Sequence, residues 1–132
     1  MAARLVHIGI AVRSLEDAVR TYAALLNVED QGIAYEENEA EGVKIAFVQL
    51  PNCRIELLEP TRPYSAIAKF LNDKGEGIHH LCFEATGELD AEGERLKAVA
   101  FRIVSESKGE HFFVHPKDCM GSLIEFYSPK RS

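Results

Sequence analysis

The chain has 132 residues, which is enough for one domain with a hydrophobic core but not for two independent domains. Apolar residues make up 46% of it and charged residues 27%, a balance that is typical of soluble globular proteins. The net charge of −6 argues against nucleic-acid binding, which needs a basic surface, and no apolar run approaches the ~20 residues of a membrane-spanning helix. We therefore expect neither a nucleic-acid partner nor a membrane partner.

The first half of the sequence begins with a strand pattern and an amphipathic helix. Alternating β-branched residues predict the strand, and Ser14, a favoured N-cap residue, precedes apolar residues at helical spacing. Turn-forming residues then separate three further strand patterns, and the acidic run at 36–41 is expected to be a solvated loop. The predicted elements are a strand at 4–12, a helix at 14–27, strands at 32–37, 43–50 and 53–59, and a short helix at 64–73.

The second half of the sequence repeats this order. Its predicted elements are a strand at 78–85, a helix at 88–99, and strands at 101–105, 111–115 and 122–128. The pattern predicts an α+β fold of two tandem βαβββ modules, residues 1–62 and 76–132, joined by the short helix. Neither module can bury its sheet alone, so we expect one domain, residues 1–132, in which the two modules form a curved sheet around a shared cleft.

Each module carries one histidine near its start and one glutamate near its end. His7 and His80 lie on the first strand of each module, and Glu56 and Glu125 lie on the last. A carboxylate on an otherwise apolar strand is costly to bury, and coordination to a metal ion removes that cost. A single strand histidine is usually a hydrogen-bonded structural residue, but the repetition of both residue types favours a shared metal site.

The second module offers two adjacent histidines, so either His79 or His80 could be its ligand. Alignment of the two first strands favours His80, in which case His79 faces the other side of the sheet. His111 and His115 are weaker candidates, and we interpret His115 as a structural residue at a strand end. The four predicted ligands, His7, Glu56, His80 and Glu125, suit Co, Ni, Mn, Fe, Mg or Zn, and the sequence does not choose among them.

Such a site predicts a particular chemistry. Four ligands on an octahedral ion leave two positions, which both oxygens of a dicarbonyl substrate could occupy while the ion stabilises an enolate as a Lewis acid. Glu56 and Glu125 are the two carboxylates at the predicted metal, and we expect Glu125 to act both as a ligand and as the base.

The cysteines and the N-terminus indicate the cellular compartment. Cys53, Cys82 and Cys119 are odd in number and widely spaced, which argues against a disulfide framework, and we interpret them as small apolar residues or weak thiols. Residues 1–4 contain no signal-peptide pattern. We therefore expect a cytoplasmic protein.

Several motifs resemble those of the vicinal oxygen chelate superfamily, and within it most closely the methylmalonyl-CoA epimerases. Residues 54–61 resemble the family's IELLEPT strand, residues 65–71 its SPIAKFL helix, residues 75–81 its GEGIHHI strand, and residues 115–125 its HPKDCGGVLIE segment. The resemblance covers nearly the whole chain, and the last two motifs are fairly specific for the epimerase branch. Residue by residue, it places the family's metal ligands on His7, Glu56, His80 and Glu125, although some members have Gln at the position of Glu56.

The resemblance implies a glyoxalase-like fold, a divalent metal cofactor, an acyl-CoA substrate, a homodimer, and epimerase activity that interconverts the 2R and 2S forms of methylmalonyl-CoA. Besides Ala66, which stands where the family's helix motif usually has proline, the chain departs from the family in two places. Residues 106–112 lack the longer glycine-rich loop that precedes the histidine-proline turn, and Ile45 stands where some members carry a glutamate proposed as a base.

Three other functions remain alternatives. A lactoylglutathione lyase-like isomerase would share the fold and the ligand set, although the motifs at 54–61 and 115–119 favour the epimerase. A non-catalytic drug-binding protein of the same fold would lack the four ligands. An extradiol dioxygenase would need an iron site of two histidines and one carboxylate, and usually a longer chain.

Overall fold

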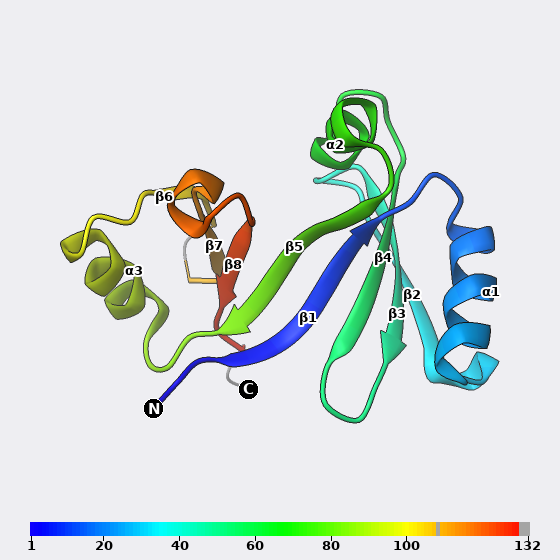
Figure 1. The fold of residues 1–132 in the computed structure, drawn as a ribbon, viewed down its shortest axis with the longest axis horizontal. Coiled ribbons are helices and arrows are strands. Elements are labelled where there is room, and N and C mark those ends of the chain that lie inside the picture. Colours follow the sequence, from blue (N-terminus) through cyan, green and yellow to red (C-terminus); the bar gives the residue numbers. More distant parts are fainter. Residues whose placement is uncertain (108, 130–132) are drawn as a thin grey trace. The chain divides into compact units, whose positions relative to one another are not determined.

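The computed structural model describes residues 1–107 and 109–129, and it confirms the predicted α+β fold of two βαβββ modules (Figure 1). The elements in chain order are β1 (Arg4–Ala11), α1 (Leu15–Leu26), β2 (Ile33–Asn38), β3 (Val43–Gln49), β4 (Arg54–Pro60), α2 (Ala66–Lys74), β5 (Gly77–Glu84), α3 (Leu89–Ala98), β6 (Ile103–Ser107), β7 (His111–Val114) and β8 (Ile124–Tyr127). Two 3₁₀ turns, Asp30–Gly32 and Pro116–Cys119, are additional to the predicted elements. None of the described helices is long and apolar enough to cross a membrane.

The chain divides into two compact units that differ slightly from the two sequence modules. One unit is Ile8–His79, and the other combines Met1–His7 with His80–Ser132. The first residues of β1, including His7, therefore belong with the C-terminal half of the chain. The boundary in β5 falls between the adjacent histidines, His79 and His80.

In the unit Ile8–His79 the strands are ordered β2-β3-β4-β1, and β2, β3 and β4 pair antiparallel. One face of this sheet packs on α1, where the core includes Ile10, Val48 and Leu57. The helix begins as the sequence predicts, because the Ser14 hydroxyl accepts a hydrogen bond from the Asp17 backbone N–H. A second cluster includes Ala11, Ile45 and Leu58 from the strands together with Ile67 and Leu71 from α2.

In the other unit β5, β8, β7 and β6 follow one another across the sheet. Strand β8 runs parallel to β5 and antiparallel to β7. Helix α3 covers one face of these strands, where Leu89 and Leu96 pack with Phe112, Val114 and Phe126. Alternate residues of the same strands therefore point to the opposite face, away from α3.

The start of β6 differs from the prediction. The sequence pattern predicts a strand at 101–105, but β6 begins at Ile103. The reason is the way α3 ends: Ala100 has a positive φ of 73°, and the backbone N–H of Phe101 donates to the Leu96 carbonyl. This closing turn uses residues 100–102, so the extended backbone starts two residues later.

The turn after β7 is fixed by one ion pair. The Asp118 carboxylate accepts hydrogen bonds from the Arg102 backbone N–H at 2.9 Å, from its Nε at 3.1 Å and from its Nη2 at 2.8 Å. The side-chain hydrogen bonds from Arg102, followed by the backbone bond, lower the pKa of Asp118 from its ordinary 3.8 to about 2. The segment 115–119, which resembles an epimerase motif, thereby anchors the connection between β7 and β8 to residue 102.

Replacement of this aspartate should change stability in a pH-dependent way. A depressed folded-state pKa means that ionised Asp118 stabilises the fold above about pH 4 and that this contribution is lost as the pH falls toward about 2. Asp118→Asn is therefore expected to lower the melting temperature at neutral pH. The difference in melting temperature between the variant and the wild type should become smaller below about pH 4. Thermal unfolding of both proteins over a pH series measures this, and a gap that stays constant with pH would contradict the ion-pair assignment.

Candidate metal centre

The direction of Glu125 follows from its neighbours on β8. Ile124 and Phe126 pack into the core under α3, so Glu125 between them points to the opposite face of the sheet. The strand register then places Glu125 beside Cys82 of β5 on one side and Phe113 of β7 on the other. His80 lies two residues before Cys82 and shares its face.

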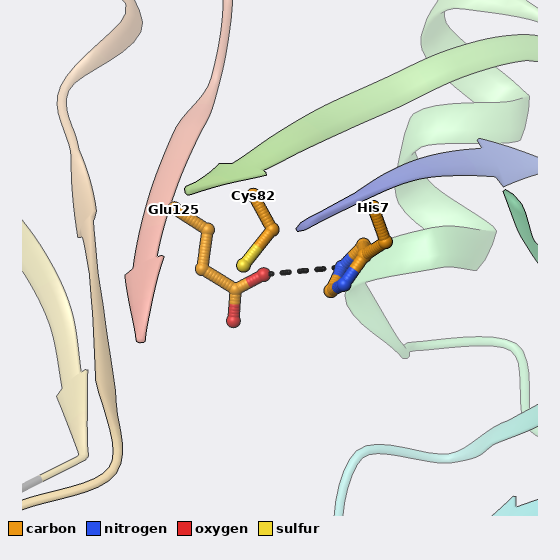
Figure 2. A group of neighbouring side chains, drawn as sticks. All are labelled: His7, Cys82 and Glu125. Atoms are coloured by element: carbon orange, nitrogen blue, oxygen red, sulfur yellow. Dashed lines mark ion pairs between the residues drawn. The ribbon is translucent and has the colours of Figure 1, made fainter. Parts of the chain in front are cut away.

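Three side chains of this unit bring their donor atoms together. The Nε2 atoms of His7 and His80 are 2.9 Å apart, and the rings meet edge to face with centroids 5.1 Å apart. Oε1 of Glu125 lies 3.3 Å from Nε2 of His80 and 3.6 Å from Nε2 of His7. Figure 2 shows the Glu125 carboxylate pointing from β8 toward the His7 ring on β1.

These separations match the edges of a metal coordination shell. Two ligand atoms that each lie about 2.1 Å from an ion are about 3.0 Å apart at a right angle and about 3.4 Å apart at a tetrahedral angle. The three distances, 2.9, 3.3 and 3.6 Å, fall in and around this range. Both histidines are 8% exposed, so the donor atoms meet at a buried position. The donor set therefore fits a divalent ion held by His7, His80 and Glu125.

The electrostatics of Glu125 agree with this fit. Burial alone raises the pKa of its carboxyl, but the neighbouring imidazoles of His7, His80 and His111 outweigh burial and bring the pKa below its ordinary value. The carboxyl is thus ionised at neutral pH, which is the form that binds a cation.

Cys82 is a residue that the sequence analysis interpreted only as a small apolar residue or a weak thiol. It is buried, at 1% exposed, but its thiol lies on the metal side of the sheet, next to Glu125 (Figure 2). The donor atoms of His7, Cys82 and Glu125 all lie within 4.8 Å of one another, so this group too could hold a metal ion. The signal was present in the strand alternation, because Cys82 follows His80 by two residues.

His80 fits the ion better than Cys82, because its Nε2 lies within 3.3 Å of both other donor atoms. We therefore expect Cys82→Ser to lower the metal affinity by less than the roughly 10- to 100-fold that loss of an outer partner typically causes. Titration of the apo-protein with Co²⁺ against a competing chelator measures the affinity. A sulfur-to-cobalt charge-transfer band in the wild type that disappears in Cys82→Ser would instead make Cys82 a ligand.

Glu56, the fourth predicted ligand, lies in the other compact unit, Ile8–His79. It is buried at 7% exposed on β4, and its Oε2 accepts a hydrogen bond from Nε of Arg54 at 3.1 Å. The Arg54 guanidinium in turn lies 5.0 Å from the centre of the Phe47 ring. The Glu56 carboxylate thus has a cationic partner on its own strand, and its roles as ligand and catalytic group stay predictions.

The other candidates from the sequence take different places. His79 packs edge to face on Phe70 of α2, with ring centroids 5.0 Å apart. The His115 Nδ1 accepts a hydrogen bond from the Lys117 backbone N–H at the start of the 3₁₀ turn. Ile45, in the place of a base of some family members, is buried in the cluster with α2. His111 is brought to the metal centre, where its Nδ1 lies 3.1 Å from Oε2 of Glu125.

Comparison with known proteins decides the family. The sequence profile of the Glyoxalase/Bleomycin resistance protein/Dioxygenase superfamily matches residues 6–114. The chain belongs to this superfamily. This membership agrees with the repeated βαβββ modules.

Within the superfamily, the chain is similar to epimerases of acyl-CoA thioesters. It is 40% identical to the ethylmalonyl-CoA/methylmalonyl-CoA epimerase of Cereibacter sphaeroides, with 95% of this chain and 97% of that protein covered. It is 38% identical to the mitochondrial methylmalonyl-CoA epimerase of Homo sapiens, with 92% and 72% covered. The structure of a Streptomyces coelicolor methylmalonyl-CoA epimerase variant in complex with 2-nitronate-propionyl-CoA matches with a TM-score of 0.86 at 33% identity, over 99% of this chain and 100% of that one.

Proposed function

We propose that the protein is a metal-dependent epimerase that interconverts the 2R and 2S forms of methylmalonyl-CoA. The observation that carries the proposal is the meeting of two imidazole nitrogens and one carboxylate oxygen within 3.6 Å at a buried position. The similarity of 38–40% to epimerases of methylmalonyl-CoA supports the choice of substrate. A shared fold alone would not, because one fold hosts many chemistries.

His7, His80 and Glu125 would hold the ion, and Glu56 is the fourth ligand that the sequence predicts. A divalent ion there supplies Lewis acidity, which stabilises the negative charge that develops on the thioester and carboxylate oxygens of the substrate when C2 loses its proton. None of these steps changes an oxidation state, so the reaction needs no oxidant and no second cofactor.

The proton transfers fall to the side chains of the chain itself. We assign proton removal from C2 to Glu125, whose carboxyl pKa is lowered and which is therefore ionised at neutral pH. Inversion requires that a proton return to the other face of C2, so a second group must act there. Glu56 is the other carboxylate predicted at the ion, and we propose it for the second face.

Hydrogen exchange at C2 tests the proposed function. With metal-loaded protein in D₂O, ¹H NMR should show C2 of methylmalonyl-CoA exchanging much faster than it does without protein. A chelator should abolish this exchange, and Mg²⁺, Co²⁺ or Mn²⁺ should restore it, because the ion acts only as a Lewis acid. Exchange that survives complete removal of metal would overturn the mechanism.

A parallel reaction separates the epimerase from its nearest rivals. Turnover of the methylglyoxal–glutathione hemithioacetal, without exchange in methylmalonyl-CoA, would indicate a lactoylglutathione lyase-like isomerase. Strict dependence on Fe²⁺ with consumption of oxygen would indicate a dioxygenase. We expect the protein to catalyse hydrogen exchange at C2 of methylmalonyl-CoA and to show neither of these two other activities.

A further inference from the structure

We propose that His111 is a positioning residue of the metal centre. Its Nδ1 lies beside Oε2 of Glu125 and would hold that oxygen, so that Oε1 alone is directed at His7 and His80. The inference rests on the proposed metal site, and it assigns a role to a residue that the sequence motifs leave without one.

Strand geometry brings His111 to this position. Phe112 and Val114 of β7 are buried at 3% and 2% exposed in the core under α3, so His111 and Phe113 point to the opposite face. In the register of β7 with β8, Phe113 lies opposite Glu125 and His111 lies opposite Tyr127. His111 is therefore the diagonal neighbour of Glu125, a spacing that a long side chain can bridge.

The two oxygens of the Glu125 carboxylate have different partners. Oε1 lies 3.3 Å from His80 Nε2 and 3.6 Å from His7 Nε2, whereas Oε2 lies 3.1 Å from Nδ1 of His111. Oε1 therefore faces the rings of His7 and His80, and Oε2 faces the ring of His111. With a proton on its Nδ1, His111 would bind one lone pair of Oε2 and leave Oε1 as the single oxygen offered to an ion. A second lone pair of Oε2 can then still accept the C2 proton.

The Nδ1 atom of His111 has a further property. It is the single buried side-chain nitrogen or oxygen among the described residues that makes no hydrogen bond, although Oε2 of Glu125 is at hydrogen-bond distance. A buried polar atom without a partner costs free energy, so a rotation of the ring or the carboxylate that aligns the two atoms is favoured. The contact to Phe113, whose ring centroid is 5.6 Å away, limits where else the imidazole can turn.

A carboxylate held by one oxygen has a chemical consequence. A free carboxylate can bind an ion with both oxygens and so occupy two coordination positions, whereas one that is tied at Oε2 occupies one. The coordination position that the second oxygen would otherwise fill stays open for an oxygen of the substrate. Hydrogen bonds to ligands from outside the coordination shell are known to set ligand orientation and metal affinity in this way.

The test compares three substitutions of His111 in the purified full-length protein. Asn carries an amide N–H near the position of Nδ1, Gln carries it near Nε2, and Leu carries none. Apo-protein is titrated with Co²⁺ against a chelator, and the visible absorption of the cobalt protein is recorded. We expect His111→Leu and His111→Gln to bind Co²⁺ about 10- to 100-fold more weakly than the wild type, the usual effect of losing an outer partner, and His111→Asn to lie close to the wild type.

The spectrum separates positioning from a general loss of structure. In His111→Leu the freed Oε2 should bind the ion, which raises the coordination number and weakens the visible bands, whereas His111→Asn should keep the wild-type intensity. Equal Co²⁺ affinity in the wild type and His111→Leu would overturn the role of His111, and so would an equal loss of Co²⁺ affinity in His111→Asn and His111→Leu. Neither result would contradict the proposed function. A wild-type protein that takes up no metal would overturn the inference together with the proposed function.

Discussion

His7→Ala and His80→Ala are each expected to reduce metal affinity by more than the roughly 10- to 100-fold that loss of an outer partner causes. Each substitution removes one of the three donor atoms that meet within 3.6 Å and leaves a gap in the coordination shell. His79→Ala should have little effect on metal binding, because His79 packs against Phe70. Metal analysis of the purified variants after identical loading and dialysis measures the difference.

His79→Ala is a matched control, since it makes the same change one residue away on the same strand. A loss of metal in His79→Ala together with normal binding in His80→Ala would mean that the strand register is wrong by one residue, which exchanges the two faces of β5. Normal binding in both His7→Ala and His80→Ala would contradict the metal centre itself. The thermal stability of each apo-variant should be checked alongside, because both histidines are buried.

The faces of the strands could be predicted from the sequence because alternation is a local property. Ile124 and Phe126 flank Glu125, so their burial fixes the direction of the glutamate wherever the strand lies in the sheet. The same rule, applied to the first strand of each module, places His7 and His80 on faces where their rings can meet. Alternation alone does not indicate that the histidines and glutamates of the two modules belong to one site. The repeat in the sequence indicates this, because each module carries the same two residue types on matching strands.

What the sequence did not predict depends on pairing between strands. Cys82 and Phe113 flank Glu125 only because of the registers of β5 and β7 with β8, and the residue pattern of a single strand does not determine its register. For the same reason, His111 was a weak candidate although its strand was predicted correctly. Strand alternation puts the Arg54 and Glu56 side chains on one face of β4, but their ion pair depends on side-chain rotamers.

Glu125→Gln is expected to remove most of the hydrogen exchange at C2 of methylmalonyl-CoA. A positioned general base typically contributes about 10²- to 10⁴-fold to a rate, and the amide that replaces the carboxylate cannot accept the C2 proton. The amide oxygen can still bind a cation, so part of the site is kept. Exchange is followed by ¹H NMR in D₂O with the metal content of each sample measured, and rates are compared per metal-loaded protein.

Glu84→Gln provides the matched control for this substitution. Glu84 lies on β5, two residues after Cys82, and its carboxylate pairs with Arg4 at 3.4 Å. The same loss of one negative charge near the same sheet face should therefore leave exchange close to the wild-type rate. If metal-loaded Glu125→Gln exchanges C2 as fast as Glu84→Gln, Glu125 is only a ligand, and the proton must be removed by another group. Glu56→Gln would then be the next variant to examine, because Glu56 is the remaining carboxylate that the sequence places at the ion.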